Sequence, residues 1–475
     1  MPIRRLVAHT SLASLEPRFA AIRAEEGVKE GRSQGALAEV AAGGQDADPA
    51  HIEGDREDQT DAPFVTIDPE GSTDLDQAVL IESVAGGWRV RYAIADVAAH
   101  VLPGGALDQE AWARVETVYC PDVRVGLHPP QMSEGYASLL PGQRTKAVVW
   151  DLRVAASGEL EEIDVRRAWV RSVRKFSYEE LAHRPPSEAS ALLADLRGFG
   201  SARRAALAKA GAVTLPKPSQ EIERDGSALT LEFRAGTPVE DDNAQVSLLT
   251  GSAAARLMVA AGVGVLRTMP PATDAAVARL RLQASAMGVP WDEGETYARM
   301  LTKLDVTSPR AAAFLTAAVS LFRGAAWSPF DVSGGLPLPD PLTHGALAAP
   351  YAHVTAPLRR LVDRYGTEVC LAHAAGRPIP EWVRDALPRL GDTMSGGVRR
   401  GNRVDRACLD AVESAVLGPH VGETFEGVGL DSDTVQLTAP AVIARCDGEI
   451  IVGRRQRLKL VSADPNKGVR FEVAS

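Results

Sequence analysis

The chain of 475 residues has few cysteines and no long hydrophobic runs. Its four cysteines lie far apart and form no CxxC pair, which argues against a zinc site or a disulfide framework; they are Cys120, Cys370, Cys408 and Cys446. No window approaches twenty uninterrupted apolar residues, so we expect no membrane-spanning segment. The N-terminus carries Arg4 and Arg5 but no long apolar stretch before its first acidic residue, which argues against a secretory signal. We therefore expect a cytoplasmic protein with reduced thiols.

The chain also lacks a net positive charge, because its formal net charge is −10 at pH 7. This value argues against a protein that coats nucleic acid with a uniformly basic surface. Basic residues are nevertheless concentrated in 143–175, in the RRQRLK stretch at 454–459 and in 358–406. A local patch of this kind can steer a polyanion, although most single arginines in such a patch are solvated surface residues.

The order of the expected elements divides the chain into four parts and predicts an α+β fold. Residues 1–42 indicate a small helical N-terminal module, and the acidic stretch 43–62 indicates a linker without apolar periodicity. Residues 63–415 begin with strand-length apolar blocks and continue with helical periodicity, interrupted by the proline-containing loop SPFDVSGGLPLPDPLTHG. Residues 416–475 return to short strands, which predicts a small β-barrel.

One loop concentrates negative charge between two apolar runs. The stretch TIDPEGSTDLDQA (66–78) contains Asp68, Asp74 and Asp76. Asp74 and Asp76 are two residues apart, so in extended chain both carboxylates point to one side, and the turn at 69–73 can fold Asp68 back beside them. Three convergent carboxylates repel one another unless a cation neutralises them, and oxygen ligands suit Mg²⁺ or Mn²⁺. A polar turn and a calcium loop are the alternatives, although the EF-hand pattern does not fit.

In four ordered blocks the chain resembles the catalytic domain of the ribonuclease II / ribonuclease R family of exoribonucleases. The carboxylate loop is similar to the family's T-I-D-x-x-x-x-x-D-x-D-D-A. It is followed by YAIADVAAHV (92–101), by the stretch 118–148 that begins VYCPDV, and by HGALAAPYAHVTAPLRRLVDR (344–364). The resemblance covers about 64–415. It implies an RNB-type catalytic domain with a sheet region and a helical region, and a C-terminal barrel that serves as an RNA-binding OB-fold.

The resemblance implies roles for the acidic loop and for the arginines of APLRR. Asp68, Asp74 and Asp76 would hold catalytic Mg²⁺, with Mn²⁺ as the alternative, and Asp76 would be catalytic. Arg359 would also be catalytic, by contacting the phosphate at the scissile bond, and Arg360 would contact RNA beside it. The alternative for both arginines is the charged first turn of a helix, although cations there oppose the helix dipole.

Two further RNA contacts are implied. Tyr178 in FSYEEL would stack on a terminal base, because base stacking on an aromatic ring tolerates any sequence. Asp405 would lie near the RNA 3′ end, where the family usually has a glutamate. The alternatives are a core aromatic for Tyr178 and an ordinary charged helix residue for Asp405.

The chain departs from the family in three places. Gln77 stands where the family loop has a fourth aspartate, and its carbonyl oxygen can ligate a metal or hydrogen-bond a metal-bound water. Gln245 lies in NAQVSLLTGSAA (243–254), where the family has an acidic stretch, and we expect both glutamines to lie around the metal ligands. The residues before the loop leave no room for the two cold-shock-type barrels with which family members usually begin.

Two functions follow from these residues. The first is a processive 3′→5′ exoribonuclease that hydrolyses single-stranded RNA to nucleoside 5′-monophosphates by a magnesium-assisted mechanism. The second is a catalytically weakened RNA-binding relative that keeps the fold and the channel, for which Gln77 and Gln245 are the argument. The three aspartates and Arg359 favour the first, and a DNA-directed nuclease is a weaker third alternative. We expect a monomer whose partner is single-stranded RNA, without a dinucleotide cofactor or membrane association.

Overall fold

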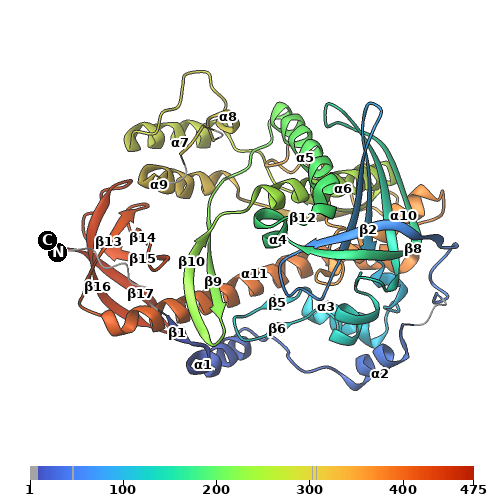
Figure 1. Cartoon of the computed structure of the whole chain (residues 1–475), viewed down its shortest axis with the longest axis horizontal. Coiled ribbons are helices and arrows are strands. Elements are labelled where there is room, and N and C mark those ends of the chain that lie inside the picture. The colour runs from blue at the N-terminus through green and yellow to red at the C-terminus, as the bar shows by residue number, and fades with distance from the viewer. Residues whose placement is uncertain (1–8, 45–47, 302, 306–307, 475) are drawn as a thin grey trace.

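The computed structural model describes residues 9–44, 48–301, 303–305 and 308–474. Two closed β-barrels lie at opposite sides of the molecule and helices pack between them (Figure 1). The long helix α11 (Glu381–Leu417) contacts the C-terminal barrel at one end and strand β12 (Ala326–Asp331) of the central region along its length. This arrangement of helices and strands confirms the predicted α+β class and the C-terminal barrel.

The first barrel is built from the apolar blocks after residue 56. Its strands pair in the order β2-β3-β4-β7-β8, and parallel pairing of β2 with β8 closes the ring; they are β2 (Glu57–Asp68), β3 (Gln77–Val84), β4 (Gly87–Ala95), β7 (Arg144–Ala155) and β8 (Leu160–Ser177). Alternate residues point inward, so that Val79, Ile81 and Trp150 are buried. Gly87 lets the start of β4 approach β7 closely, because a Cβ there would lie 2.0 Å from the carbonyl oxygen of Val154.

A compact insertion between β4 and β7 lies beside the carboxylate loop. It contains η1 (Val97–Ala99), α3 (Ala106–Arg114), β5 (Val118–Tyr119), β6 (Arg124–Val125) and the π-helical turn η2 (Met132–Tyr136). Strands β5 and β6 form a short antiparallel hairpin. Leu127 and Leu139, which follow this hairpin, are both buried, so the insertion is anchored in the core.

Helices dominate the chain after the first barrel. They are α4 (Tyr178–His183), η3 (Ser187–Ala189), α5 (Ser190–Ala210), α6 (Pro238–Ala261), α7 (Asp274–Met287), α8 (Tyr297–Leu301), α9 (Pro309–Ala318), η4 (Val319–Leu321), α10 (Leu361–Ala374) and α11. Helix α6 begins at a capping box, in which the Thr237 hydroxyl accepts from the Glu240 N–H and the Glu240 carboxylate accepts from the Thr237 N–H. Pro238 follows as the first helical residue, where its missing N–H costs nothing.

Two strand pairs interrupt this helical region and correct the sequence-based expectation. Strand β11 (Val263–Thr268) lies in a stretch with helical periodicity and pairs with β12, which lies in the expected proline-containing loop. Strands β9 (Ser219–Asp225) and β10 (Ala228–Arg234) form a second pair that local periodicity did not indicate. Strands β9 and β10 are a local hairpin with two residues between them, whereas β11 and β12 pair across almost sixty residues, so local periodicity carries little signal for β11 and β12.

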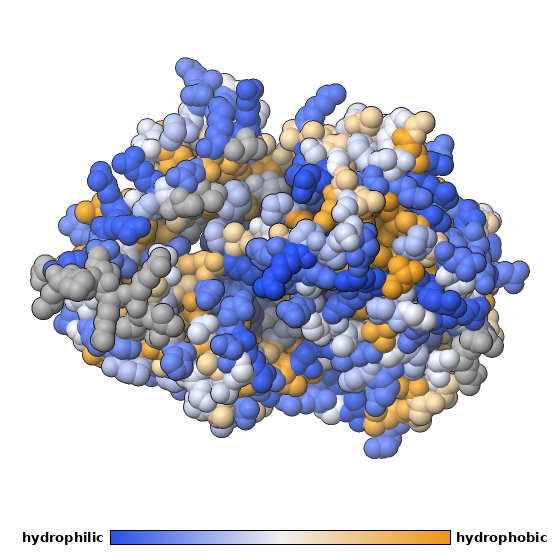
Figure 2. Space-filling model, in the orientation of Figure 1, coloured by the Kyte–Doolittle hydropathy of each residue, from blue (hydrophilic) through white to orange (hydrophobic). Residues whose placement is uncertain are grey.

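Helix α6 is the one helix among the described residues that is long and apolar enough to cross a membrane. Half of its most apolar window is buried inside the protein. The helix packs against α5, α10 and β11, which is the environment of a core helix. On the face shown in Figure 2, hydrophobic residues form separate patches among hydrophilic ones and no continuous band.

The C-terminal barrel is a second closed ring. Its strands pair in the order β13-β14-β15-β17-β16; they are β13 (Thr424–Gly429), β14 (Thr434–Leu437), β15 (Val442–Asp447), β16 (Arg455–Asp464) and β17 (Gly468–Val473), preceded by the turn η5 (Gly418–His420). The core of this barrel includes Val435, Leu458 and Phe471 and continues into the buried face of α11. The barrel and the helix therefore share one hydrophobic core.

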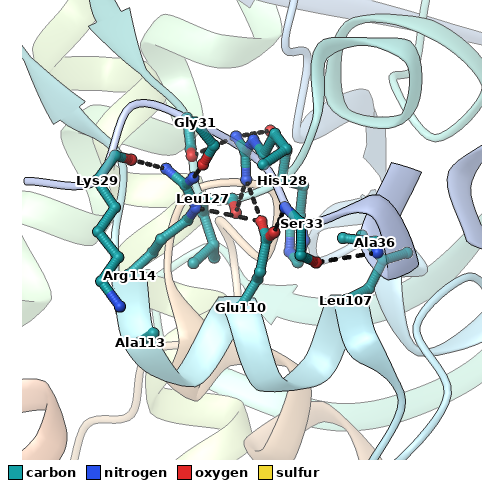
Figure 3. A network of polar contacts seen from close by, with 12 residues as sticks. Lys29, Gly31, Ser33, Ala36, Leu107, Glu110, Ala113, Arg114, Leu127 and His128 are labelled. Carbon is teal, nitrogen blue, oxygen red and sulfur yellow. Dashed lines mark hydrogen bonds and ion pairs between the residues drawn. The ribbon is translucent and has the colours of Figure 1, made fainter. Parts of the chain in front are cut away.

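The N-terminal segment forms two helices, as predicted, but is built into the rest of the molecule. Strand β1 (Thr10–Ser11) pairs with β10, α1 (Leu12–Glu25) packs on α11, and α2 (Gln34–Ala42) packs on α3. Between the helices, Arg114 donates to the carbonyl oxygens of Lys29 and Gly31, and Glu110 accepts from the Ser33 N–H (Figure 3). The expected linker is also shorter than predicted, because β2 begins at Glu57 and takes in residues 57–62.

Candidate active site

The carboxylate loop joins β2 to β3 and is fixed by its central leucine. Leu75 is fully buried, its N–H donates to the Ser138 hydroxyl at 2.9 Å, and its carbonyl accepts from the Leu139 N–H at 3.0 Å. Because side chains alternate in extended chain, Asp74 and Asp76 point away from this core. The two carboxylates are close enough for the charge of Asp74 to raise the pKa of Asp76, as their spacing predicts.

Asp76 is the most deeply buried of the three aspartates. Its Oδ1 accepts from the Leu358 N–H at 2.7 Å, and its Oδ2 lies 3.6 Å from the Arg359 Nε. Burial raises the pKa of Asp76 to about 8, against the opposing effects of Arg359 and of the Leu358 hydrogen bond. The carboxylate therefore needs additional positive charge to stay ionised at neutral pH.

Asp68, the last residue of β2, lies on the same side of the loop. Its Oδ2 is buried without a hydrogen-bond partner. Burial raises the pKa of Asp68 to about 6; the charge of Asp74 acts in the same direction, and Lys175 opposes both. Lys175 is held in place by donating to the Ser72 carbonyl at 2.6 Å. The Oδ2 of Asp68 is therefore free to accept a hydrogen bond or to contact a cation.

Asp74 is engaged by a residue that sequence reasoning missed. Its carboxylate forms an ion pair with Arg124 of β6, and Arg124 also pairs with Glu134. The Thr73 hydroxyl donates to Glu134 at 2.9 Å, which ties the loop to the insertion. Among the described residues, no group of three or more Asp, Glu, His or Cys side chains is arranged to hold a metal ion. Of the three aspartates of the loop, Asp74 is hydrogen-bonded to an arginine, whereas Asp68 and Asp76 are not.

The two arginines of APLRR have different environments. The Arg359 side chain is 47% exposed and reaches over Asp76, whereas the Arg360 side chain is 20% exposed and binds Asp363 through two hydrogen bonds of 2.9 and 2.7 Å. Helix α10 begins at Leu361, so both arginines precede it and neither lies in its first turn. Arg359 is thus available to bind an anion. Arg360 is already bound to Asp363, which competes with the RNA contact predicted for it.

Two tyrosines border the carboxylates. Tyr178 begins α4, and its hydroxyl accepts from Asn243 Nδ2 at 2.8 Å. Burial raises the pKa of Tyr178 to about 12, and the charges of Asp68 and Arg359 also act on it, which places its hydroxyl near both. The second tyrosine, Tyr119, was not predicted as a site residue, although it stands in the VYCPDV motif. Its side chain is 54% exposed, and the charges of Asp74, Arg359 and Asp76 act on its hydroxyl. An exposed ring at this place can stack on a base.

The remaining predicted residues lie elsewhere or have other contacts. Asp405 is exposed on α11, and no contact among the described residues joins it to the carboxylate loop. Gln245 is buried in α6, where its Nε2 lies 3.4 Å from the Asp241 carbonyl and its Oε1 has no partner. Asn243 of the same stretch contacts the site by donating to Tyr178. Gln77 is hydrogen-bonded at both ends of its carboxamide, as described below.

One glycine of the predicted departure has a steric explanation. Gly251 of α6 lies in the same stretch as Gln245, and a Cβ there would lie 2.2 Å from the Tyr351 ring and 2.6 Å from the Ala352 carbonyl oxygen. The Ala352 N–H also donates to the Gly251 carbonyl at 3.1 Å. The glycine therefore lets the segment before Arg359 pack directly on α6.

Two family patterns match most of this chain. The RNB domain matches residues 56–369, and the RNase II-type exonuclease C-terminal S1 domain matches residues 423–474. These ranges contain the first barrel with the site described above, and the second barrel, respectively.

Individual relatives carry related names. Ribonuclease R of Acidithiobacillus ferrooxidans is 36% identical over 134 residues, which is 28% of this chain and 30% of that protein. The inactive exonuclease DIS3L2 of Arabidopsis thaliana is 40% identical over 127 residues, 26% of this chain and 12% of that protein. The matches thus cover less than a third of either relative.

A solved structure has the same fold over almost the whole chain. Mycoplasma genitalium RNase R in complex with ribose methylated single-stranded RNA superposes with a TM-score of 0.84 and 19% identity, over 96% of this chain and 78% of that one. The RNB match alone spans more than half of the sequence. The chain belongs to the RNB domain family, joined to an RNase II-type S1 domain.

Proposed function

We propose that the chain is a 3′→5′ exoribonuclease that hydrolyses single-stranded RNA to nucleoside 5′-monophosphates, and that it acts processively. The observation that carries the proposal is the pairing of an exposed guanidinium with a buried carboxylate, Arg359 Nε 3.6 Å from Asp76 Oδ2, beside the unpartnered Oδ2 of Asp68. Names of RNB relatives and the single-stranded RNA bound by the structural neighbour support this substrate class.

Asp68 and Asp76 offer carboxylate oxygens, which are the donors that a hard divalent cation takes. Burial raises the pKa values of Asp68 and Asp76 to about 6 and about 8, and a cation between them would offset that cost. We propose that these two carboxylates, with Asp74 beside them, would hold Mg²⁺ or Mn²⁺. A cation held there supplies positive charge for the phosphate and acidifies a bound water.

The protein's own residues would bind and orient the RNA end. The exposed guanidinium of Arg359 can donate hydrogen bonds to a phosphate oxygen. Its positive charge then offsets the negative charge that builds up on the phosphate during cleavage. Tyr119 offers a ring face for a base, and Tyr178, held by Asn243, lies near Asp68 and Arg359. None of these contacts reads base identity, so we expect cleavage without sequence preference.

The first prediction tests the enzyme directly. Purified protein is stripped with a chelator and given 5′-labelled poly(A) with Mg²⁺ or Mn²⁺ added back. We expect a ladder that shortens from the 3′ end, and a loss of at least about 100-fold in Asp76→Asn, because that change removes a charge from the reacting centre. Asp61→Asn, an exposed aspartate on the same strand as Asp68, is the matched control and should retain activity.

An RNA-binding relative with weak or no cleavage is the second candidate. Its support is Gln77, which stands where the family has an aspartate, and the presence of an inactive exonuclease among the relatives. Tight RNA binding with no shortening under either metal would establish this candidate and reject the enzyme.

A further inference from the structure

Gln77 connects four elements through its carboxamide. Its Nε2 donates to the Thr355 carbonyl, and its Oε1 accepts from the Tyr92 hydroxyl at 2.7 Å. The Tyr92 oxygen lies 2.9 Å from the Ser247 hydroxyl, and Tyr92 is 2% exposed. The chain of contacts thus runs from α6 through β4 and β3 to the segment 355–360.

The direction of each hydrogen bond in this chain follows from its ends. The Thr355 carbonyl can only accept, so Gln77 must donate to it through its NH₂ group. The Gln77 carbonyl can only accept, so Tyr92 must donate to it and Ser247 must in turn donate to Tyr92. A side chain at residue 77 therefore needs a donor and an acceptor together, which an amide provides and an ionised carboxylate does not.

The segment 355–360 carries the groups that face Asp76. Gln77 holds this segment at the Thr355 carbonyl, and Asp76, the neighbouring residue, holds it at the Leu358 N–H at 2.7 Å. Arg359 follows directly, with its Nε 3.6 Å from Asp76. Asp363 completes the arrangement by accepting from the Ala356 N–H at 2.7 Å.

We propose that Gln77 is a positioning residue, which fixes the segment 355–360 so that Arg359 lies over Asp76, and that it is not a metal ligand. Its carboxamide is already held at both ends, because Oε1 accepts from the buried Tyr92 hydroxyl and Nε2 donates to the Thr355 carbonyl, and these two contacts fix its orientation. The expected effect on kcat rests on the proposed function. The expected loosening of the segment 355–360 does not depend on any activity.

The second prediction separates positioning from ligation. Gln77→Met keeps the side-chain length and removes both hydrogen bonds, and Gln77→Asp supplies the carboxylate of the family but cannot donate to Thr355. We expect kcat to fall about 10-fold to 100-fold in both variants, since a shift of about 1 Å at a reacting group costs this much. We expect KM for poly(A) to change less than about 3-fold, because the basic surfaces and tyrosines are intact.

The matched control is Gln109→Met on α3. Gln109 also donates its Nε2 to a backbone carbonyl, that of Gly104 at 2.9 Å, but it is exposed and outside the site. Tyr92→Phe removes the donor to Gln77 together with the acceptor for Ser247. It should also lower kcat, and it serves if either Gln77 variant fails to fold. A rise in kcat or tighter Mn²⁺ binding in Gln77→Asp, measured by calorimetry, would overturn the proposal and make residue 77 a ligand position.

Hydrogen–deuterium exchange gives a readout that needs neither activity nor metal. In Gln77→Met the amides of 355–360 should exchange at least about 10-fold faster than in the wild type, because the segment loses its hold at Thr355. Gln109→Met should leave them unchanged. If wild-type protein degrades no RNA, the proposed function fails and exchange alone decides this proposal; unchanged exchange in Gln77→Met would reject it whatever the activity.

Discussion

At the scale of single residues, two adjacent arginines should fail in different ways when they are removed. Arg359 is 47% exposed and faces Asp76, so Arg359→Ala should lower kcat by about 100-fold with little change in stability. Arg360 neutralises Asp363, which is 0% exposed, so Arg360→Ala should cost about 3 to 5 kcal/mol of unfolding free energy. Urea denaturation and single-turnover cleavage measure the two effects. Equal stability of the two variants would contradict this assignment.

Sequence alone could suggest candidate site residues only where they stand in a short recognisable motif. The three aspartates and Arg359 stand in short patterns. The structure places Arg359 Nε 3.6 Å from Asp76 Oδ2, and the charge of Asp74 acts on both Asp68 and Asp76. Among the described residues no three carboxylates are arranged to hold a metal ion, so the predicted metal-binding role of the aspartates stays a prediction. The contacts of Gln77 were not predictable, because Thr355 lies 278 positions away and the backbone decides which carbonyl faces the side chain. Arg124 was missed for the same reason, since an arginine in a hairpin gives no local sign that it pairs with Asp74.

At the scale of an element, α11 carries a buried acid that should make stability depend on pH. Glu413 is 0% exposed, and burial raises its pKa to about 7 from the ordinary 4.5. The unfolded chain releases this proton first, so the stabilising contribution is full below pH 4.5 and is lost as pH rises to 7. Glu413→Gln should therefore gain roughly 3 kcal/mol at pH 8 and almost nothing at pH 4.5.

The measurement for Glu413 is urea denaturation at both pH values. Gln220 Nε2 donates to Glu413 at 2.6 Å, and a glutamine carbonyl at residue 413 can accept the same hydrogen bond. Asp392→Asn, at an exposed position of the same helix, is the control and should shift neither curve. A Glu413→Gln gain that is equal at the two pH values would show that packing, and not ionisation, causes it.

Elements with a strong period of their own were predictable, and elements that depend on a partner were not. Strands β7 and β8 are long and alternate, and the helices of α10 and α11 have clear apolar faces. Strand β12 contains Ser328-Pro329-Phe330 and forms because β11 lies beside it, with Pro329 opposite Val265. The proline-rich appearance of that stretch therefore pointed to a loop, while tertiary pairing made it a strand.

At the scale of the whole molecule, the N-terminal segment and the C-terminal barrel belong to one hydrophobic core. That core contains Phe19 and Ile22 of α1, Val412 of α11, Leu231 of β10 and Phe471 of β17. The sequence predicted a helical module, a linker and a separate barrel, because composition shows where elements begin but not what their apolar faces meet. The shared core ties the ends of the chain together around α11.

The last prediction follows from this shared core. Phe19 is 0% exposed, so Phe19→Ala should cost about 3 to 5 kcal/mol by leaving a cavity between α1 and α11. Leu282→Ala, at a position 73% exposed on α7, should cost less than about 0.5 kcal/mol. Because the cavity borders the core of the second barrel, hydrogen–deuterium exchange in β14 to β17 should also accelerate in Phe19→Ala. Acceleration confined to residues 10–25 would instead mean that the N-terminal helices unfold as an independent unit, and the shared core would then contribute little to the stability of the barrel.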